Sequence, residues 1–164
     1  MKTLLIMRHA KSSWSNGHLG DHDRPLNPRG NAAAPRIGTM LRDLGLVPDT
    51  ILTSTANRAH STAVLVAEAC GYTQDIAVYG ELYHGTPADY LAQIARLSEA
   101  YECPLLVGHN PHLEDLIFML TGQVEEMPTA AVAYVELPIE SWEALTPKVQ
   151  GTLLNVWRPK EIEA

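Results

Sequence analysis

Arginine and histidine side chains follow three of the apolar runs that we expect to be strands. Arg8 and His9 end the first run, Arg58 lies shortly after the second, and His109 follows the fourth. In α/β proteins the carboxyl ends of parallel strands meet at one edge of the sheet, where ligands bind. We therefore expect Arg8, His9, Arg58 and His109 to form one group at that edge.

The chemistry that suits this group is the binding and transfer of a phosphoryl dianion. Each guanidinium, of Arg8 and of Arg58, can donate two parallel N–H groups to non-bridging oxygens. The first turn of the helix that carries Arg58 adds free backbone N–H groups. Two cationic neighbours favour a neutral His9, whose lone pair can then attack phosphorus. His109 can donate a hydrogen bond to the charge that develops on the phosphoryl oxygens.

Other catalytic motifs are absent from the sequence. It contains no GxSxG, GxxxxGK[ST], GxGxxG or HExxH, and neither Cys70 nor Cys103 is followed six residues later by the arginine of a cysteine phosphatase. The two cysteines form no CxxC pair and no disulfide framework. His18 and His22 have a spacing that metal ligands can use, but the nearby glycines and Pro25 favour a loop. We expect neither a metal nor a cofactor.

Strand and helix patterns alternate along the chain and must position these residues. Apolar, β-branched runs of strand length lie at residues 3–7, 50–53, 76–79, 105–107, 131–137 and 152–157. Helical patterns lie between them, at residues 27–45, 56–70, 87–100 and 110–122. This alternation predicts an α/β fold of three layers, in which helices cover both faces of a mostly parallel sheet.

Length and composition are those of one ordinary globular domain. The chain has 164 residues, of which 46% are hydrophobic and 19% charged, and no repeat or linker divides it, so we expect one domain over residues 1–164. No apolar run is long enough to span a membrane, and Arg8 comes too early for a signal peptide, so we expect a cytoplasmic protein. We also expect a monomer, because no apolar stripe is left over for a second copy.

The charges are unevenly distributed. The net charge of −7 argues against binding to nucleic acid, which needs a basic surface. Residues 1–60 carry eight basic and four acidic side chains, whereas residues 61–164 carry four basic and fifteen acidic ones. The basic half could assemble an anion site, or the imbalance could simply be an acidic surface elsewhere. We expect Lys11 and Arg24 to be solvated, with attraction of an acidic partner as the alternative.

Four ordered blocks of the sequence resemble the histidine phosphatase superfamily. They are LIMRHAKSSW at residues 5–14, DRPLNPRG at 23–30, STANRAHSTA at 54–63 and VGHNP at 107–111. The alanine after His9 is similar to that of the short SixA-type phosphohistidine phosphatase branch. The resemblance implies a phosphoglycerate mutase-like fold without a cap insertion. It also implies that His9 is the nucleophile that becomes phosphohistidine, and that Arg8, Arg58 and His109 form the phosphate pocket.

Two further positions follow from the resemblance. Relatives often contact phosphate through an asparagine seven residues after the first arginine, and this chain has Ser15 there. The general acid of relatives is a carboxylate after the third strand, for which Glu81 is the nearest candidate. An alcohol leaves poorly unless an acid protonates it, whereas an imidazole can take its proton from solvent. A weak acid would therefore favour a phosphohistidine substrate.

These observations predict a metal-independent phosphatase that acts on phosphohistidine in a protein, such as a histidine-phosphotransfer domain. The first alternative is a phosphatase of small phosphomonoesters that uses the same His9 chemistry. A mutase is less favoured, because a short chain offers little enclosure to keep water from the intermediate. A catalytically silent phosphate-binding module is the remaining alternative. We expect neither a nucleic acid nor a membrane as partner.

Overall fold

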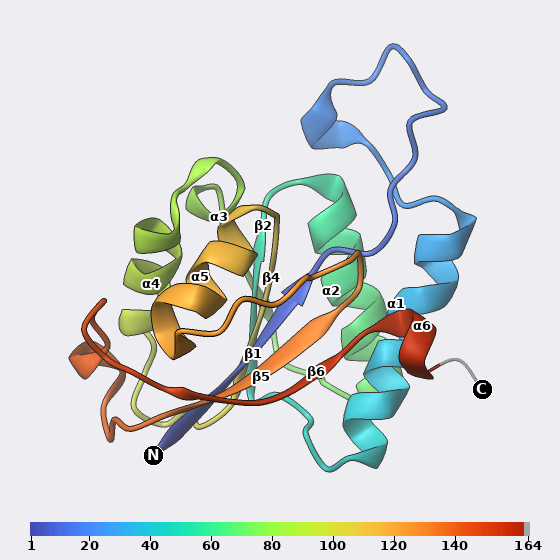
Figure 1. The fold of residues 1–164 in the computed structure, drawn as a ribbon. Coiled ribbons are helices and arrows are strands. Elements are labelled where there is room, and N and C mark those ends of the chain that lie inside the picture. Colours follow the sequence, from blue (N-terminus) through green and yellow to red (C-terminus); the bar gives the residue numbers. More distant parts are fainter. Residues whose placement is uncertain (163–164) are drawn as a thin grey trace.

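A six-stranded sheet runs through the middle of the computed structural model, which describes residues 1–162 (Figure 1). Strands β1 to β4 are parallel to one another, β5 pairs antiparallel with β1, and β6 pairs antiparallel with β5. The order is β3-β2-β4-β1-β5-β6, with β1 (Lys2–Arg8), β2 (Thr50–Ser54), β3 (Ile76–Tyr79), β4 (Pro104–Gly108), β5 (Val132–Leu137) and β6 (Thr152–Trp157). The predicted mostly parallel sheet is confirmed. The last two residues of the predicted domain, 1–164, lie outside the described residues.

Helices cover both faces of the sheet, so the predicted three layers are also confirmed (Figure 1). One face carries α1 (Pro28–Asp43) and α2 (Asn57–Cys70), with the short α6 (Pro159–Ile162) beside α1. The other face carries α3 (Glu81–His84), α4 (Pro87–Ala95) and α5 (His112–Thr121). Two 3₁₀ helices, η1 (Asp21–Asp23) and η2 (Trp142–Ala144), lie in the connections.

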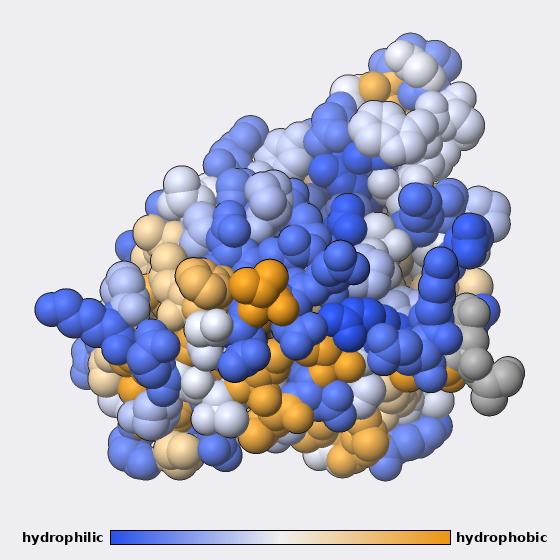
Figure 2. All heavy atoms as spheres, in the orientation of Figure 1, coloured by the Kyte–Doolittle hydropathy of each residue, from blue (hydrophilic) through white to orange (hydrophobic). Residues whose placement is uncertain are grey.

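The surface separates polar from apolar side chains. On the face shown in Figure 2, hydrophilic side chains prevail around the upper edge of the sheet, and hydrophobic ones gather lower, in front of β5 and β6. Within residues 1–162, every helix is too short or too polar to span a lipid bilayer.

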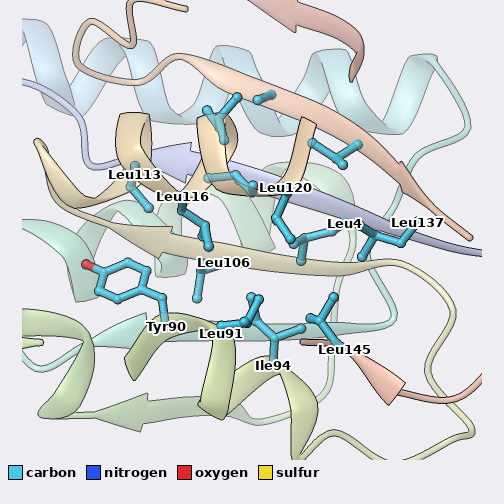
Figure 3. Close-up of a cluster of buried hydrophobic side chains, with 14 of the residues drawn as sticks. Leu4, Tyr90, Leu91, Ile94, Leu106, Leu113, Leu116, Leu120, Leu137 and Leu145 are labelled. Atoms are coloured by element: carbon cyan, nitrogen blue, oxygen red, sulfur yellow. The ribbon is translucent and has the colours of Figure 1, made fainter. Parts of the chain in front are cut away.

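The alternation of side chains along the strands divides the core into two clusters. Leu4 and Ile6 of β1 join the cluster under α4 and α5, whereas Leu5 and Met7 join the cluster under α1 and α2. The reason is that successive residues of a strand point to opposite faces of the sheet. Figure 3 shows the first cluster, in which Leu4 and Leu106 lie between leucines of α5 and side chains of α4. Helices on both faces thus fix the strand ends.

Short sequence signals set the start of α1, near the carboxyl ends of the parallel strands. The Asn27 side chain accepts a hydrogen bond from the Gly30 backbone N–H at 2.9 Å, and Pro28 takes the first helical position of α1. A Cβ at Gly30 would lie 2.1 Å from the Lys11 carbonyl oxygen. Only glycine therefore lets the start of α1 pack directly against the chain that follows His9.

The helices between β3 and β4 differ from the prediction in two ways. The helix expected over residues 87–100 ends at Ala95, where the backbone N–H of Arg96 bonds to the carbonyls of Gln93 and Ile94. Glu99 lies beyond the helix, and its carboxylate accepts from Ser141 Oγ and from the Trp142 backbone N–H, at 2.7 and 3.2 Å. The α3 helix was not expected. It has only four residues, too few to show a helical period.

The contact between α1 and α2 gives a stability prediction. A Cβ at Gly38 would lie 2.5 Å from the Val66 carbonyl oxygen and 2.7 Å from the Ala69 Cβ. We expect Gly38→Ala to lower the free energy of unfolding by about 1–3 kcal/mol in chemical denaturation, despite the better helix propensity of alanine. Gly80→Ala is the control, because nothing lies within 4 Å of its Cβ position and its φ is −63°. Equal stability of the two variants would contradict a close α1–α2 contact.

Candidate active site

The structure brings the four predicted residues Arg8, His9, Arg58 and His109 together at the carboxyl edge of the sheet. Arg8 ends β1 opposite Gly108, the last residue of β4, and the His9 backbone N–H donates to the Gly108 carbonyl at 3.1 Å. The rings of His9 and His109 lie 5.1 Å apart, centroid to centroid. Arg58 reaches the same place from the first turn of α2, and all four line one cavity of about 540 Å³.

His9 is held as a neutral imidazole with one nitrogen free. Its Nδ1 lies 2.7 Å from the Ala10 carbonyl oxygen. Because a carbonyl can only accept, Nδ1 carries the proton and Nε2 keeps its lone pair. Burial lowers the pKa of His9 to about 4, and the charges of Arg58 and Arg8 act in the same direction. The ring therefore remains uncharged at neutral pH.

His109 is oriented so that it can donate a hydrogen bond into the cavity. Its Nε2 lies 2.7 Å from Ser54 Oγ, which itself accepts from the Ala56 backbone N–H at 3.3 Å. This arrangement suits a Ser54 hydroxyl that donates to Nε2, which leaves the proton of His109 on Nδ1. Nδ1 is buried and has no partner within residues 1–162. Burial, followed by the nearby His9, lowers the pKa of His109 to about 3.

Both arginines keep one buried donor unused. Arg8 Nη1 donates to the Met127 carbonyl at 3.2 Å, and Arg58 Nη1 donates to the Asp21 carbonyl at 2.7 Å. The Nε atoms of Arg8 and Arg58, like Nδ1 of His109, are buried without a partner in the described part of the chain. Unpaired buried donors are rare in proteins. Three of them, on residues that line one cavity, can bind an anion with several oxygens.

Asp21 connects the cavity to its rim, a contribution that the sequence analysis did not find. Its Oδ2 accepts from Arg58 Nη2 at 3.0 Å and from the Tyr83 hydroxyl at 2.7 Å, and its Oδ1 accepts from Arg24 Nε at 3.1 Å. The Tyr83 hydrogen bond, together with Arg58 and Arg24, lowers the pKa of Asp21 to about 2. Asp21 is therefore a carboxylate at neutral pH and holds the Arg58 head in place. The only sequence signal was its position three residues before Arg24.

The rim segment, residues 13–25, is anchored by Arg24. The expectation that Arg24 is solvated is wrong: it is 7% exposed, and its Nη1 donates to Ser12 Oγ at 2.7 Å. Its guanidinium lies 3.4 Å from the centre of the Trp14 ring. These contacts remove Arg24 from water although its neighbours in the sequence are polar. Lys11 is exposed, as expected.

Two residues assigned from the resemblance do not reach the cavity. Glu81 is exposed at the start of α3, and the residues of that helix that line the cavity are Tyr83 and His84. Ser15 is also exposed, and its Oγ lies 2.7 Å from Ser13 Oγ rather than facing the cavity. The structure therefore brings neither residue to Arg8 and His9.

The segment that carries His18 and His22 forms the loop that its glycines favour, with the single turn η1 inside it. His22 Nε2 lies 2.8 Å from Thr55 Oγ1, and its ring packs against Tyr83 at 4.9 Å between centroids. Over residues 1–162 there is no group of three or more His, Cys, Asp or Glu side chains that could hold a metal ion.

Comparisons with known proteins agree on the family. Residues 4–82 match the family model of the histidine phosphatase superfamily, branch 1. An uncharacterized chloroplast protein of Arabidopsis thaliana is 31% identical over 87% of this chain and 69% of its own length. A structure from Agrobacterium tumefaciens, assigned as the phosphohistidine phosphatase SixA, is 28% identical with a TM-score of 0.82, over 96% of this chain and 98% of that one. A structure from Nakamurella multipartitia with the same assignment is 26% identical with a TM-score of 0.82, over 96% of both chains.

The buried imidazoles give a prediction for pH titration. A lowered pKa means that the ring takes up its proton only in more acidic solution. We expect the ring carbon NMR signals of His9 and His109 to report neutral imidazole down to about pH 5, because their pKa values are about 4 and about 3. His9→Asn and His109→Asn would assign the two signals. A His9 midpoint near the ordinary value of about 6.5 would show that burial does not control this ring.

Proposed function

Because the chain belongs to branch 1 of the histidine phosphatase superfamily, we propose that it hydrolyses phosphohistidine on a protein, with His9 as the nucleophile. The observation that carries the proposal is the set of buried N–H groups on Arg8, Arg58 and His109 around a neutral His9. The two SixA structures supply the substrate class, since both are assigned as phosphohistidine phosphatases.

In the binding step the phosphoryl oxygens accept hydrogen bonds from Arg8 Nε, Arg58 Nε and His109 Nδ1. Other atoms of the same three side chains bond to Met127, Asp21 and Ser54, which holds the donors in place before the anion arrives. The same donors stabilise the charge that spreads over the phosphoryl oxygens in the transition state.

In the first chemical step His9 Nε2 attacks phosphorus and forms a P–N bond. The bond between phosphorus and the substrate's imidazole nitrogen breaks, and that nitrogen keeps the electron pair and takes a proton from solvent. The Nδ1–H of His9 continues to donate to the Ala10 carbonyl, which stabilises the positive charge of the phosphorylated ring. In the second step water attacks phosphorus, His9 Nε2 leaves with its electron pair as neutral imidazole, and phosphate leaves with both protons of the water, as dihydrogen phosphate.

The protonation state of the carboxylate in the cavity lining favours an imidazole, and not an alcohol, as the leaving group. Among the residues of the described chain that line the cavity, Asp21 is the sole carboxylate, and its pKa of about 2 leaves it ionised at neutral pH. It therefore holds no proton to give to an alkoxide. Glu81, the acid suggested by the resemblance, is exposed and outside the cavity lining. A phosphohistidine substrate needs no such acid, because its imidazole is a better leaving group once protonated by solvent.

Small phosphomonoesters are the second candidate substrates. His84 and His112 also line the cavity, and histidine is the side chain that most often acts as general acid. Either ring could protonate the ester oxygen of the substrate as the P–O bond breaks and phosphorus bonds to His9. The catalytically silent module has less support, since Arg8, His9, Arg58 and His109 are all present and share one cavity.

The role of His9 has a direct test. We expect His9→Ala to lose turnover of an activated aryl phosphate by at least about 10³-fold, because the variant lacks the nitrogen that we propose as the nucleophile. The variant should also lose the covalent label that forms with ³²P-labelled substrate. His60→Ala is the control, since His60 is exposed on α2 and outside the cavity lining. Labelling that survives in His9→Ala would remove His9 from the nucleophile role.

The substrate class is tested by comparing kcat/KM in the presence of chelator. A phosphohistidine-bearing histidine-phosphotransfer domain should be preferred over a panel of small phosphomonoesters by about 10²-fold or more, equivalent to about 2.7 kcal/mol of transition-state stabilisation. Activity in chelator should equal activity without it, because no step uses a metal. A faster reaction with one small ester would keep the His9 chemistry and assign the protein to metabolite turnover.

A further inference from the structure

A second cavity of about 730 Å³ adjoins the active site on the side of α1. It lies between the start of α1, the loop at residues 128–129 and α6, which are close together in Figure 1. Lys11 and Thr129 line both this cavity and the active-site cavity. The second cavity, which we name the α1–α6 groove, therefore borders the active-site cavity.

The charged side chains that line the groove are mostly cationic. The five cationic side chains that line it are Lys11, Arg29, Arg36, Arg158 and Lys160, in a protein of net charge −7. The acidic residue among its lining is Glu161, which pairs with Arg158 at 3.4 Å. Arg158 also pairs with Glu125 at 2.8 Å.

Three of these cations are available to a ligand. Lys11, Arg29 and Lys160 are exposed, and within residues 1–162 no carboxylate lies within 4.0 Å of any of them. On the face shown in Figure 2, hydrophilic side chains gather where α6 meets α1. An anion that binds here would gain charge pairing without breaking an existing ion pair of these three residues.

The groove also has an apolar wall, which limits the kind of anion it suits. Side chains without charge or hydrogen-bonding groups alternate with the cations, namely Pro28, Ala32, Ala33, Pro128 and Pro159. A small inorganic ion would leave this wall in water. A chain segment that carries both carboxylates and apolar side chains would cover the wall and pair with the cations at the same time.

We propose that the α1–α6 groove binds an acidic, partly apolar segment of the substrate phosphoprotein, while the phosphohistidine of that phosphoprotein lies at His9. This inference rests on the proposed function: the phosphoprotein contacts the active site with its phosphohistidine and the α1–α6 groove with its acidic segment. Because Lys11 and Thr129 line both cavities, the two lie close enough for one partner to occupy both at once. The cations of the groove would attract an acidic segment although the net charge of the chain is −7, because positive charge is gathered at the point of contact.

Binding in the groove is remote from phosphorus and is the same in the ground state and the transition state. Such uniform binding lowers KM and leaves kcat unchanged. It also makes KM depend on salt, because exposed charges are screened. A small aryl phosphate does not extend into the groove, so its kinetics serve as an internal measure of an intact active site.

The first arm of the test measures binding alone. The probe is a fluorescein-labelled peptide of Glu, Asp and Leu residues, followed by anisotropy, beside a peptide with Gln and Asn in place of the acids. The double variant Arg29→Glu/Lys160→Glu should weaken binding of the acidic peptide by about tenfold or more. The control Arg42→Glu/Arg96→Glu changes the net charge equally at exposed sites outside the groove, and should bind like wild type. Equal losses in both double variants would overturn the proposal.

The second arm uses the phosphohistidine-bearing histidine-phosphotransfer domain and para-nitrophenyl phosphate. Arg29→Glu/Lys160→Glu should raise KM for the protein by about tenfold and leave kcat and aryl phosphate turnover within about twofold. If the domain is hydrolysed and its KM does not change in this variant, the groove proposal is wrong and the proposed function stands. If no phosphohistidine protein is hydrolysed but the acidic peptide binds the groove selectively, the anion site stands and the proposed function is wrong.

Discussion

The site depends on keeping two imidazole rings neutral beside two guanidinium groups. Burial removes the proton from His9 and His109, whereas arginine keeps its charge in any protein environment. Positive charge and lone pairs therefore reside on different residues within one cavity. A pocket of four cations would bind an anion but could not attack it. The same burial that packs the strand ends thus also keeps free lone pairs beside the two guanidinium charges.

The fold supplies this burial by bringing three strand ends under helices on both faces. Pairing of Arg8 with Gly108 in the register of β1 and β4 places the two histidines side by side. The contact of α1 with α2 fixes the helix on which Arg58 lies, and Gly30 lets α1 start directly against the chain after His9. Strand ends and the first turn of α2 therefore carry the four side chains. The guanidinium groups of Arg58 and Arg8 are held by contacts from the connections, at Asp21 and Met127.

The strands, the main helices and the four site residues could be predicted because each has a local signature. Apolar runs, helix caps and residues at strand ends are properties of short stretches. The rim could not be predicted, because Asp21 acquires its role from Arg58 and Tyr83, which are distant in the sequence. Arg24 was misjudged for the same reason, since Trp14 and Ser12 cover it only after folding. Glu81 failed because a four-residue helix turns its neighbours Tyr83 and His84 toward the cavity instead.

The hydrogen bond from His9 Nδ1 to the Ala10 carbonyl has a consequence for how this chemistry is inherited. It dictates the regioisomer of any phosphoramidate formed on His9, because only Nε2 is open to phosphorus. The group that imposes this choice belongs to the main chain, so it is encoded by the path of the backbone and not by the identity of residue 10. A substitution of Ala10 that fits the core therefore keeps this hydrogen bond and leaves Nε2 as the free nitrogen of His9.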